Sequence, residues 1–329
     1  MSDMNNGEQG KQSKPGRWEQ NLLHQVLTAS LAENRRSRRW GIFFKFLTFG
    51  YLFLVAGLFL WSGKLEMGSS LAKEHTALVE VDGVIASNTE ASADRVVSGL
   101  RNAFADKKTK GVILRMNTPG GSPVQSRYIN REILRLKKKY PDIPVYAVVV
   151  DACASGGYYI AAAADKIYAD EGSLVGSIGV RIDTFGFVEG MQKLGIERRL
   201  LTAGEHKAIL DPFSPLEEQD RKHIEEMLGD LHRQFIAVVR EGRGDRLQEA
   251  AHPEIFSGLF WSGEKAKALG LIDDFGSSSY VAREVIGAEE IVDFTLKEDV
   301  WDRLARRFGA GAMESLGRVG GLGEGPQLR

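Results

Sequence analysis

The sequence predicts an α/β fold with a mainly parallel sheet, preceded by one N-terminal transmembrane helix. Two observations carry this prediction. From about residue 76 onward, apolar β-branched stretches alternate with amphipathic helical stretches, which is the pattern of a parallel sheet with covering helices. Before them lies a single long apolar run, residues 41–61, that contains only one charged residue.

Composition limits the classes of function. The 329 residues suffice for one large domain or two modest ones. A net charge of −1 gives no indication of a nucleic-acid surface, so no nucleic-acid partner is expected. The single cysteine, Cys153, excludes an intrachain disulfide and is expected to be a buried packing residue rather than a nucleophile. We expect neither a metal nor a cofactor.

The apolar run Gly41–Trp61 is predicted to be an uncleaved membrane anchor. At about 1.5 Å per residue it spans roughly 31 Å, the thickness of a bilayer core. Its one charge, Lys45, lies near one end, where it can reach the interface. A cleavable signal peptide is the main alternative, but about forty residues precede the run and no clear A-x-A site follows it. Four arginines (35, 36, 38 and 39) precede it, so the positive-inside rule places the N-terminus in the cytoplasm and the rest of the chain outside.

The domain boundaries follow from the anchor and from composition. Residues 1–40 are expected to form a largely disordered cytoplasmic segment, because they begin with a polar stretch without periodicity. Residues 62–75 are interpreted as a linker, residues 76–296 as the main domain, and residues 297–329 as a C-terminal helix and a Gly-rich flexible tail.

Within the main domain, hydrophobic periodicity and capping residues predict each element in turn. The clearest predicted strands are 76–83, 110–117 and 145–150. The predicted helices are 92–106, 124–140, the Ala-rich 158–165, the long 215–240, and one beginning near Ser262 and ending near Gly270.

Two glycine-containing turns follow predicted strands, namely "NTPGGS" (117–122) and "ASGG" (154–157). Both are expected at the carboxyl edge of the sheet, where sites of α/β proteins form. Such turns can aim backbone N–H groups at an oxyanion. The chain has neither GxxxxGK[ST] nor GxGxxG, so nucleotide binding has weak support. Ser155 does not fit G-x-S-x-G, because Cys153 occupies the first glycine position. From these residues alone, a packing turn and a nucleophile turn have equal standing.

A serine nucleophile needs a base. The six histidines are 24, 75, 206, 223, 232 and 252, and none has an obvious local Asp partner in the sequence. Lys207, in "AGEHKAILDPF", is the more interesting candidate, since Ser–Lys dyads are a variant of the catalytic triad. A lysine acts as a base only when its amine is neutral, which a low-dielectric pocket favours. By the residues alone, a solvated surface lysine is the commoner interpretation.

The span from about Thr76 to Ile286 resembles the S49 family of membrane-anchored serine peptidases, the signal peptide peptidase type. Four motifs carry the resemblance together: "NTPGG" (117–121), "DACASGGYYIAAAADKIYA" (151–169), "GSLVGSIGV" (172–180) and "AGEHKAILDPF" (203–213). The resemblance implies a ClpP/crotonase-like fold of repeated strand–strand–helix units.

The resemblance also implies roles for individual residues. The nucleophile falls on Ser155, the lysine base on Lys207, and a serine that positions the lysine on Ser177. The oxyanion hole falls on Gly120 or Gly121 together with the amide of Gly156. Two features depart from the family: the chain has one catalytic repeat rather than the two of double-length members, and "DAC" precedes the serine where many relatives have smaller residues. The second departure concerns the shape of the pocket rather than the dyad.

The function implied by the resemblance is that of an endopeptidase. Its expected substrates are hydrophobic peptides, such as released signal peptide remnants, cleaved at the outer face of a bacterial cytoplasmic membrane. In a Gram-negative bacterium this face is periplasmic. Residues 41–61 are expected to hold the chain in the lipid bilayer, and the family forms homo-oligomers with sites near subunit interfaces. The alternatives are a non-catalytic scaffold or binding protein on the same fold, and a crotonase-like acyl-CoA enzyme. An extracytoplasmic location disfavours the latter.

Overall fold

The computed structural model describes residues 40–57 and 73–297, which belong to two units divided between Ser69 and Ser70. The first unit contributes the helix Trp40–Gly57, with a mean hydropathy of 1.5 and exposed side chains. Among the described residues it is the one helix long and apolar enough to cross a membrane. The predicted N-terminal segment 1–40, the end of the predicted anchor (58–61), the linker 62–75 and the C-terminal part 297–329 lie almost wholly outside the described residues.

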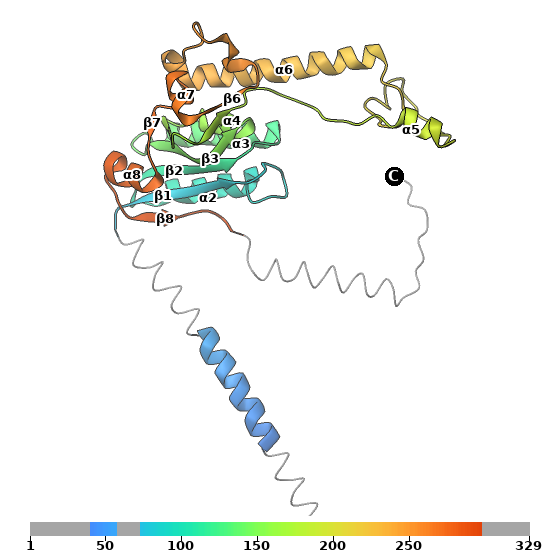
Figure 1. The fold of residues 1–329 in the computed structure, drawn as a ribbon. Helices are drawn as coiled ribbons and strands as arrows, with labels where there is room; N and C mark the ends of the chain where they lie inside the picture. Colours follow the sequence, from blue (N-terminus) through green and yellow to red (C-terminus); the bar gives the residue numbers. More distant parts are fainter. Residues whose placement is uncertain (1–39, 58–72, 298–329) are drawn as a thin grey trace, which may run out of the picture. The chain divides into compact units, whose positions relative to one another are not determined.

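The described part of the second unit is built on one eight-stranded sheet (Figure 1). Its strands are β1 (His75–Asp82), β2 (Thr109–Thr118), β3 (Val145–Ala154), β4 (Lys166–Ala169), β5 (Leu174–Gly176), β6 (Phe260–Ser262), β7 (Asp274–Phe275) and β8 (Ile291–Asp293). The main path runs β6-β5-β3-β2-β1-β8, and β4 joins β3 to β7. Every pairing is parallel except that of β5 with β6. The predicted α/β class with a mainly parallel sheet is confirmed.

The helices of this unit alternate with the strands along the chain. They are α2 (Ala93–Ala105), α3 (Pro123–Lys139), α4 (Gly156–Ala161), α5 (Val188–Lys193), α6 (Glu218–Arg243), α7 (Gly263–Ala268) and α8 (Ser278–Tyr280), with shorter turns η1 (Gly244–Arg246) and η2 (Pro253–Phe256) and the π-helical η3 (Val281–Ile286). The start of α3 shows why the sequence predicts these elements well. The hydroxyl of Ser122 accepts from the Gln125 amide, and Pro123 occupies the first turn, where its missing N–H costs nothing.

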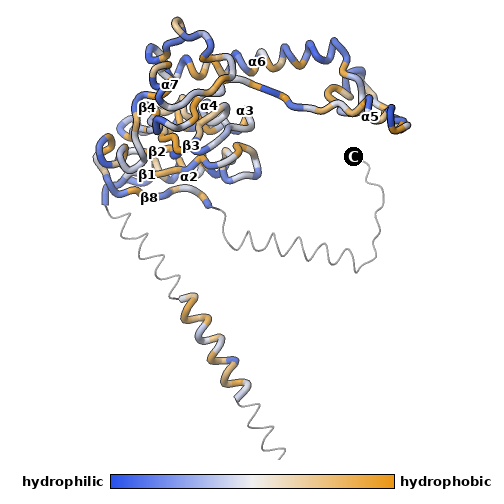
Figure 2. Tube along the Cα trace, in the orientation of Figure 1, coloured by the Kyte–Doolittle hydropathy of each residue, from blue (hydrophilic) through white to orange (hydrophobic). Residues whose placement is uncertain are grey.

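The core lies on both faces of the central strands, which Figure 2 shows as apolar stretches. On one face Val79, Leu114 and Ile133 are fully buried in a large cluster that includes side chains of α2, α3 and α4. On the other face Ile113 and Val148 form a smaller cluster with residues of η3. Burial on both faces explains why these strands are continuous apolar runs in the sequence.

The third strand changes neighbour along its length. Residues Tyr146–Val148 pair with β4, whereas Ala152–Ala154 pair with β5. The carboxyl end of β3 therefore lies between β2 and β5, because Cys153 still pairs with Thr118 of β2. This end of β3 leads directly into residue 155.

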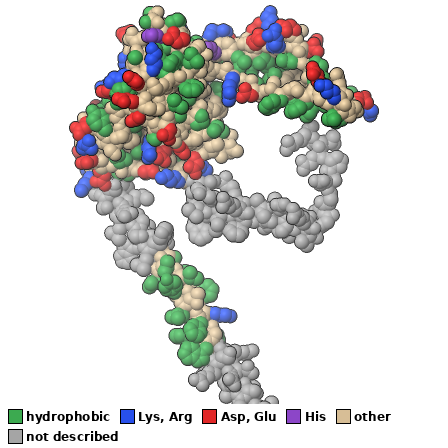
Figure 3. Space-filling view, in the orientation of Figure 1, with side chains coloured by type: hydrophobic (Ala, Val, Ile, Leu, Met, Phe, Trp, Pro, Cys, Tyr) green, Lys and Arg blue, Asp and Glu red, His purple; other side chains and the backbone are tan. Residues whose placement is uncertain are grey.

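Residues 181–217, between β5 and α6, form a segment that we call the arm. None of its side chains is buried, and Figure 1 shows it extending away from the sheet. The arm has its own contacts, since the Phe187 ring stacks on Phe213 at 5.6 Å and the Arg198 guanidinium lies over Phe213. Its exposed large apolar residues, part of the hydrophobic surface in Figure 3, are Ile182, Phe185, Phe187, Leu194, Ile196, Leu200, Leu201, Phe213 and Leu216.

The prediction of a helix over 215–240 was wrong by about one turn at each end. The hydroxyl of Ser214 donates to the Asp211 carboxylate at 2.6 Å instead of capping a helix. The first turn therefore begins later, after Glu217. The helix runs on to Arg243 and stops at Gly244, whose φ of 52° ends the helical backbone.

Candidate active site

Ser155 lies where β3 turns into α4. Its φ of 52° and ψ of −120° are uncommon for a residue with a side chain. Two hydrogen bonds hold this conformation: its amide donates to the Gly176 carbonyl at 2.9 Å, and its carbonyl accepts from the Tyr159 amide at 3.0 Å. Ser155 is half-buried, so the residue is fixed by its backbone and keeps access to solvent. Strained backbone of this kind gathers at functional sites.

The structure places Ser177 beside Ser155. Strands β3 and β5 pair with Ala154 opposite Gly176, and each serine is the next residue along its strand. Ser177 also has a positive φ, 54°, and its amide donates to the Leu259 carbonyl at 2.7 Å. Two serines with a positive φ thus lie next to each other at the carboxyl edge of the sheet.

Gly120 packs directly against the turn that carries Ser155. A Cβ atom at Gly120 would lie 2.7 Å from the Gly156 nitrogen and 2.8 Å from the Ser155 Cβ, and its φ is +98°. Only glycine fits so close an approach of two backbones. The Gly120 amide, however, donates to the hydroxyl of Thr118 at 3.1 Å, and that hydroxyl donates to the Gly83 carbonyl at 2.6 Å. Because the amide is already engaged, Gly120 is a poor donor for an oxyanion.

The amide of Gly121 has a different position. A bridge to Ile85 uses the Gly120 carbonyl and the Ser122 amide, and leaves the Gly121 amide out. This nitrogen lies 3.2 Å from where a Cβ of Gly156 would be. The amide of Gly156 opens α4 and has no acceptor within that helix. Of the two glycines that the sequence left open, the geometry favours Gly121, paired with Gly156, as an oxyanion donor.

Lys207 is not brought to these serines within one chain. It lies on the arm, is exposed, and its amide donates to the nearby Gly204 carbonyl at 3.2 Å. Among the described residues, no hydrogen bond or ion pair joins Lys207 to Ser155 or Ser177. Its neighbour His206 is held by Asp220, whose carboxylate lies 2.6 Å from the ring Nδ1. The low-dielectric surroundings that a neutral lysine requires are therefore not supplied to Lys207 by the arm itself.

Cys153 is buried in the core, as expected from the sequence. Burial raises the pKa of its thiol, because the apolar surroundings disfavour the thiolate. A cysteine that is both enclosed and protonated cannot attack a substrate, so Cys153 does not act as a nucleophile at this turn. In residues 40–57 and 73–297, no cluster of three or more His, Cys, Asp or Glu side chains could hold a metal ion.

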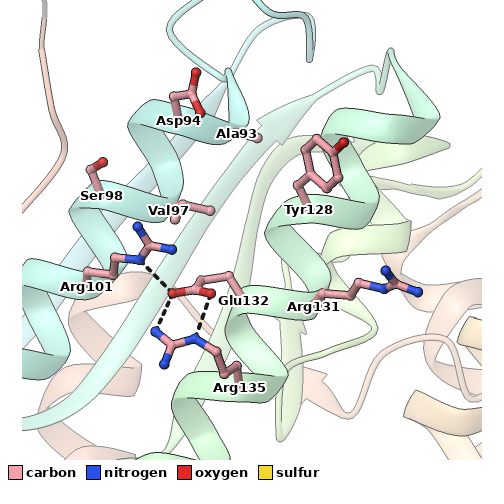
Figure 4. Close-up of a pocket in the computed structure, with 9 residues that line it drawn as sticks. All are labelled: Ala93, Asp94, Val97, Ser98, Arg101, Tyr128, Arg131, Glu132 and Arg135. Atoms are coloured by element: carbon pink, nitrogen blue, oxygen red, sulfur yellow. Dashed lines mark hydrogen bonds and ion pairs between the residues drawn. The ribbon is translucent and has the colours of Figure 1, made fainter.

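A hollow of about 620 Å³ lies between α2 and α3 (Figure 4). Its lining residues are Ala93, Asp94, Val97, Ser98, Arg101, Tyr128, Arg131, Glu132 and Arg135. The Glu132 carboxylate accepts hydrogen bonds from Arg135 and Arg101, which lower its pKa to about 2. The bond from Arg101 of α2 joins that helix to α3, whereas the bonds from Arg135 lie within α3, so these charged residues have a structural role. The hollow contains none of the residues expected in the active site.

Sequence reasoning missed two residues near the serines. Thr118 orders the glycine turn through its hydroxyl, and its place directly before "PGG" was a usable signal. His232, on α6, has its ring Nε2 3.2 Å from the Ile178 carbonyl, next to Ser177. No sequence pattern links His232 to this turn, because 54 residues separate the two partners.

Comparison with known proteins gives one family match and several relatives. Residues 137–291 match peptidase family S49. A Na(+)/H(+) antiporter NhaA of Brucella abortus is 45% identical over 188 residues, which are 57% of this chain and 25% of that protein. The "Putative signal peptide peptidase SppA" of Enterococcus faecium is 32% identical over 242 residues, 71% of this chain and 69% of that protein. Protease 4 of Haemophilus influenzae is 31% identical over 221 residues, 66% of this chain and 35% of that protein.

The relatives differ in how much of their length this chain matches. It spans a quarter of the antiporter and about a third of protease 4, so their names describe proteins of which only a part is similar. The Enterococcus faecium protein is similar over more than two thirds of both chains.

Proposed function

We propose, because this chain belongs to peptidase family S49, that it is a serine peptidase with Ser155 as nucleophile and Lys207 as general base. The observation that carries the proposal is the turn at Ser155. A serine with strained backbone stands between a glycine turn and a second serine, Ser177, at the carboxyl edge of a parallel sheet. A scaffold protein has no need of this arrangement.

The proposed reaction has two stages. The Ser155 Oγ attacks the peptide carbonyl while the neutral Lys207 amine takes its proton, and a C–O bond forms. Collapse of the tetrahedral intermediate breaks the C–N bond, and the lysine returns the proton to the leaving amine. Water then attacks the acyl-enzyme with the same lysine as base, which releases the carboxylic acid and restores Ser155. The amides of Gly121 and Gly156 would donate to the oxyanion in both stages.

The proposal requires that a neighbouring copy supply Lys207. The arm that carries this lysine exposes a row of large apolar side chains, with Leu201 at 96% exposure, and none of its side chains is buried. An exposed apolar surface of this extent is typical of an interface. Docking the arm on another copy would cover these side chains and give Lys207 the dry surroundings that a base needs.

The test of the shared site is complementation between inactive variants. Full-length Ser155→Ala and Lys207→Ala chains are purified separately in detergent and then mixed under conditions that allow subunits to exchange. A shared site predicts that activity on a hydrophobic peptide reappears, because some interfaces pair an intact Ser155 with an intact Lys207. A mixture that stays inactive, although labelled subunits have exchanged, would refute the sharing.

The test of the chemistry uses the single variants. Ser155→Ala and Lys207→Ala should each lower kcat/KM by several orders of magnitude, because nucleophile and base work as a unit. Lys207→Arg should be equally inactive, since a guanidinium does not give up its proton. Retained turnover in folded Ser155→Ala would disprove Ser155 as the nucleophile, whereas a folded wild-type protein without peptidase activity would favour the scaffold alternative.

We further propose that the chain is anchored in a bacterial cytoplasmic membrane by residues 41–61 and acts at its outer face. The apolar helix Trp40–Gly57 and the arginines before it support this orientation. Hydrophobic peptides, including remnants of signal peptides, are the substrates that such a location would supply. The name of the Enterococcus faecium relative agrees with that class. Protease added to right-side-out spheroplasts should digest the domain after residue 62, whereas a protected domain would contradict the orientation.

A further inference from the structure

Each of the residues 176–179, which form the turn after β5, makes a backbone hydrogen bond or a close backbone contact. The Gly176 carbonyl accepts from the Ser155 amide, and the Ser177 amide donates to the Leu259 carbonyl. Gly179 packs closely on Gly258, since a Cβ there would lie 3.1 Å from the Gly258 Cα. Ile178 has a fully buried side chain, and its carbonyl faces α6.

The partner of that carbonyl is His232. Its ring Nε2 lies 3.2 Å from the Ile178 oxygen, and a carbonyl oxygen can only accept a hydrogen bond. The Nε2 atom must therefore carry a hydrogen and donate it. His232 is partly buried, and one turn along α6 the Phe235 ring packs against Tyr159 of α4 at a centroid distance of 5.1 Å. The donor thus stands on a helix that is fixed to the same α4 that follows Ser155.

The bond matters because Ser177 is in a conformation that it would not hold unaided. A non-glycine residue with φ near 54° stores strain and persists only when its surroundings determine it. The Leu259 carbonyl holds the amide of Ser177, and the His232 ring holds the carbonyl of the next residue. Without the ring, the Ile178 carbonyl, in the peptide unit between Ile178 and Gly179, would lose its only side-chain partner among the described residues. The backbone that follows Ser177 would then be less constrained.

We infer that His232 is a positioning residue for the Ser–Lys reaction. By donating to the Ile178 carbonyl it fixes the backbone of Ser177, so that the Ser177 hydroxyl points to where the lysine amine must lie. The inference rests on the proposed function, because it assumes that Ser177 orients the base. His232 itself does not touch substrate and exchanges no proton with it.

The test compares two amides of different length at position 232 in the full-length protein. The side-chain nitrogen of Gln reaches as far as the histidine Nε2, whereas that of Asn reaches only as far as Nδ1. His232→Gln can therefore rebuild the bond, and His232→Asn and His232→Ala cannot. His223→Ala, on an exposed position of the same helix, is the matched control.

We expect kcat of the Ala and Asn variants to fall about fivefold to tenfold, the effect of one lost neutral hydrogen bond. KM should stay within about twofold, because the substrate is not contacted. The Gln variant should recover most of kcat. All three variants should have similar thermal midpoints, so that the recovery does not come from a difference in stability. Equal loss in Gln and Asn, a loss only in KM, or wild-type kcat in His232→Ala would each overturn the inference. Ser155→Ala, measured in parallel, reports separately on the proposed function, since a failure of that proposal would leave Ser155→Ala active.

Discussion

Replacing Gly120 by alanine tests whether the glycine turn and the Ser155 turn are in direct contact. The added Cβ would lie 2.7 Å from the Gly156 nitrogen, and ordinary contact begins near 3.4 Å. The two turns must therefore separate by about 0.7 Å, the difference between these distances. Two of the three nearest atoms, the Gly156 nitrogen and the Ala154 oxygen, belong to the backbone, and the third is the Ser155 Cβ, whose position the backbone sets, so no side-chain rotation can relieve the clash.

The expected loss of folding stability in Gly120→Ala has two parts. A side chain at φ +98° costs about 1–2 kcal/mol, and overpacking of a closed site costs roughly 1–3 kcal/mol more. A displacement of this size at the proposed oxyanion donors and the proposed nucleophile should also lower kcat/KM by about a hundredfold, since catalytic geometry tolerates little misplacement.

Gly287→Ala is the control for the conformational part alone. Gly287 has φ +77°, and nothing lies within 4 Å of its added Cβ. It should lose only about 1 kcal/mol of stability and keep its activity. The assays are cleavage of a hydrophobic peptide and urea unfolding of both variants. If Gly120→Ala matched Gly287→Ala in both, the close contact between the two turns would be refuted.

Three further predictions concern groups whose surroundings the structure defines. The free energy of unfolding of Glu132→Gln should be about 1–2 kcal/mol lower than that of wild type at neutral pH, because Arg135 and Arg101 hold the wild-type carboxylate with a pKa near 2. This stabilisation is present above pH 4.5 and is lost as the pH falls towards 2. The urea midpoints of wild type and variant should therefore converge at low pH. Cys153 should resist alkylation in the folded protein and react only on unfolding; rapid labelling of native protein by iodoacetamide would contradict its burial. His206→Ala should keep kcat/KM within about threefold of wild type, because the ring is paired with Asp220, and a loss as large as that of Lys207→Ala would make histidine the base.

Much of the fold could be predicted because its signals are local. The strands around Val79, Leu114 and Val148 are buried on both faces, and a strand buried in this way consists of consecutive apolar residues. The glycine turn and the Ser155 turn could be predicted to share an edge, because parallel strands end on the same side. Membership of family S49 confirms the ClpP/crotonase-like fold that the four motifs imply.

Other features have no local signal. The change of neighbour along β3, from β4 to β5, depends on tertiary pairing, which hydrophobic periodicity does not predict. The contact of His232 with the Ile178 carbonyl joins segments far apart in the chain. The choice of Gly121 over Gly120 required knowing that Thr118 already occupies the Gly120 amide. The arm could not be recognised as exposed, because its apolar residues suggest burial until the packing is seen.

The positive φ of Ser155 restricts which residues could replace it as the proposed nucleophile. A β-branched side chain is a genuine outlier at φ near 50°, because its second γ-substituent crowds the backbone. Threonine is therefore excluded at residue 155, although it carries the same hydroxyl. Cysteine has one γ atom, as serine does, and fits the same backbone. Exchange of Ser155 for cysteine could therefore lead to a thiol hydrolase. Exchange for threonine could not lead to a threonine hydrolase, because the backbone geometry at residue 155 does not accept a β-branched side chain.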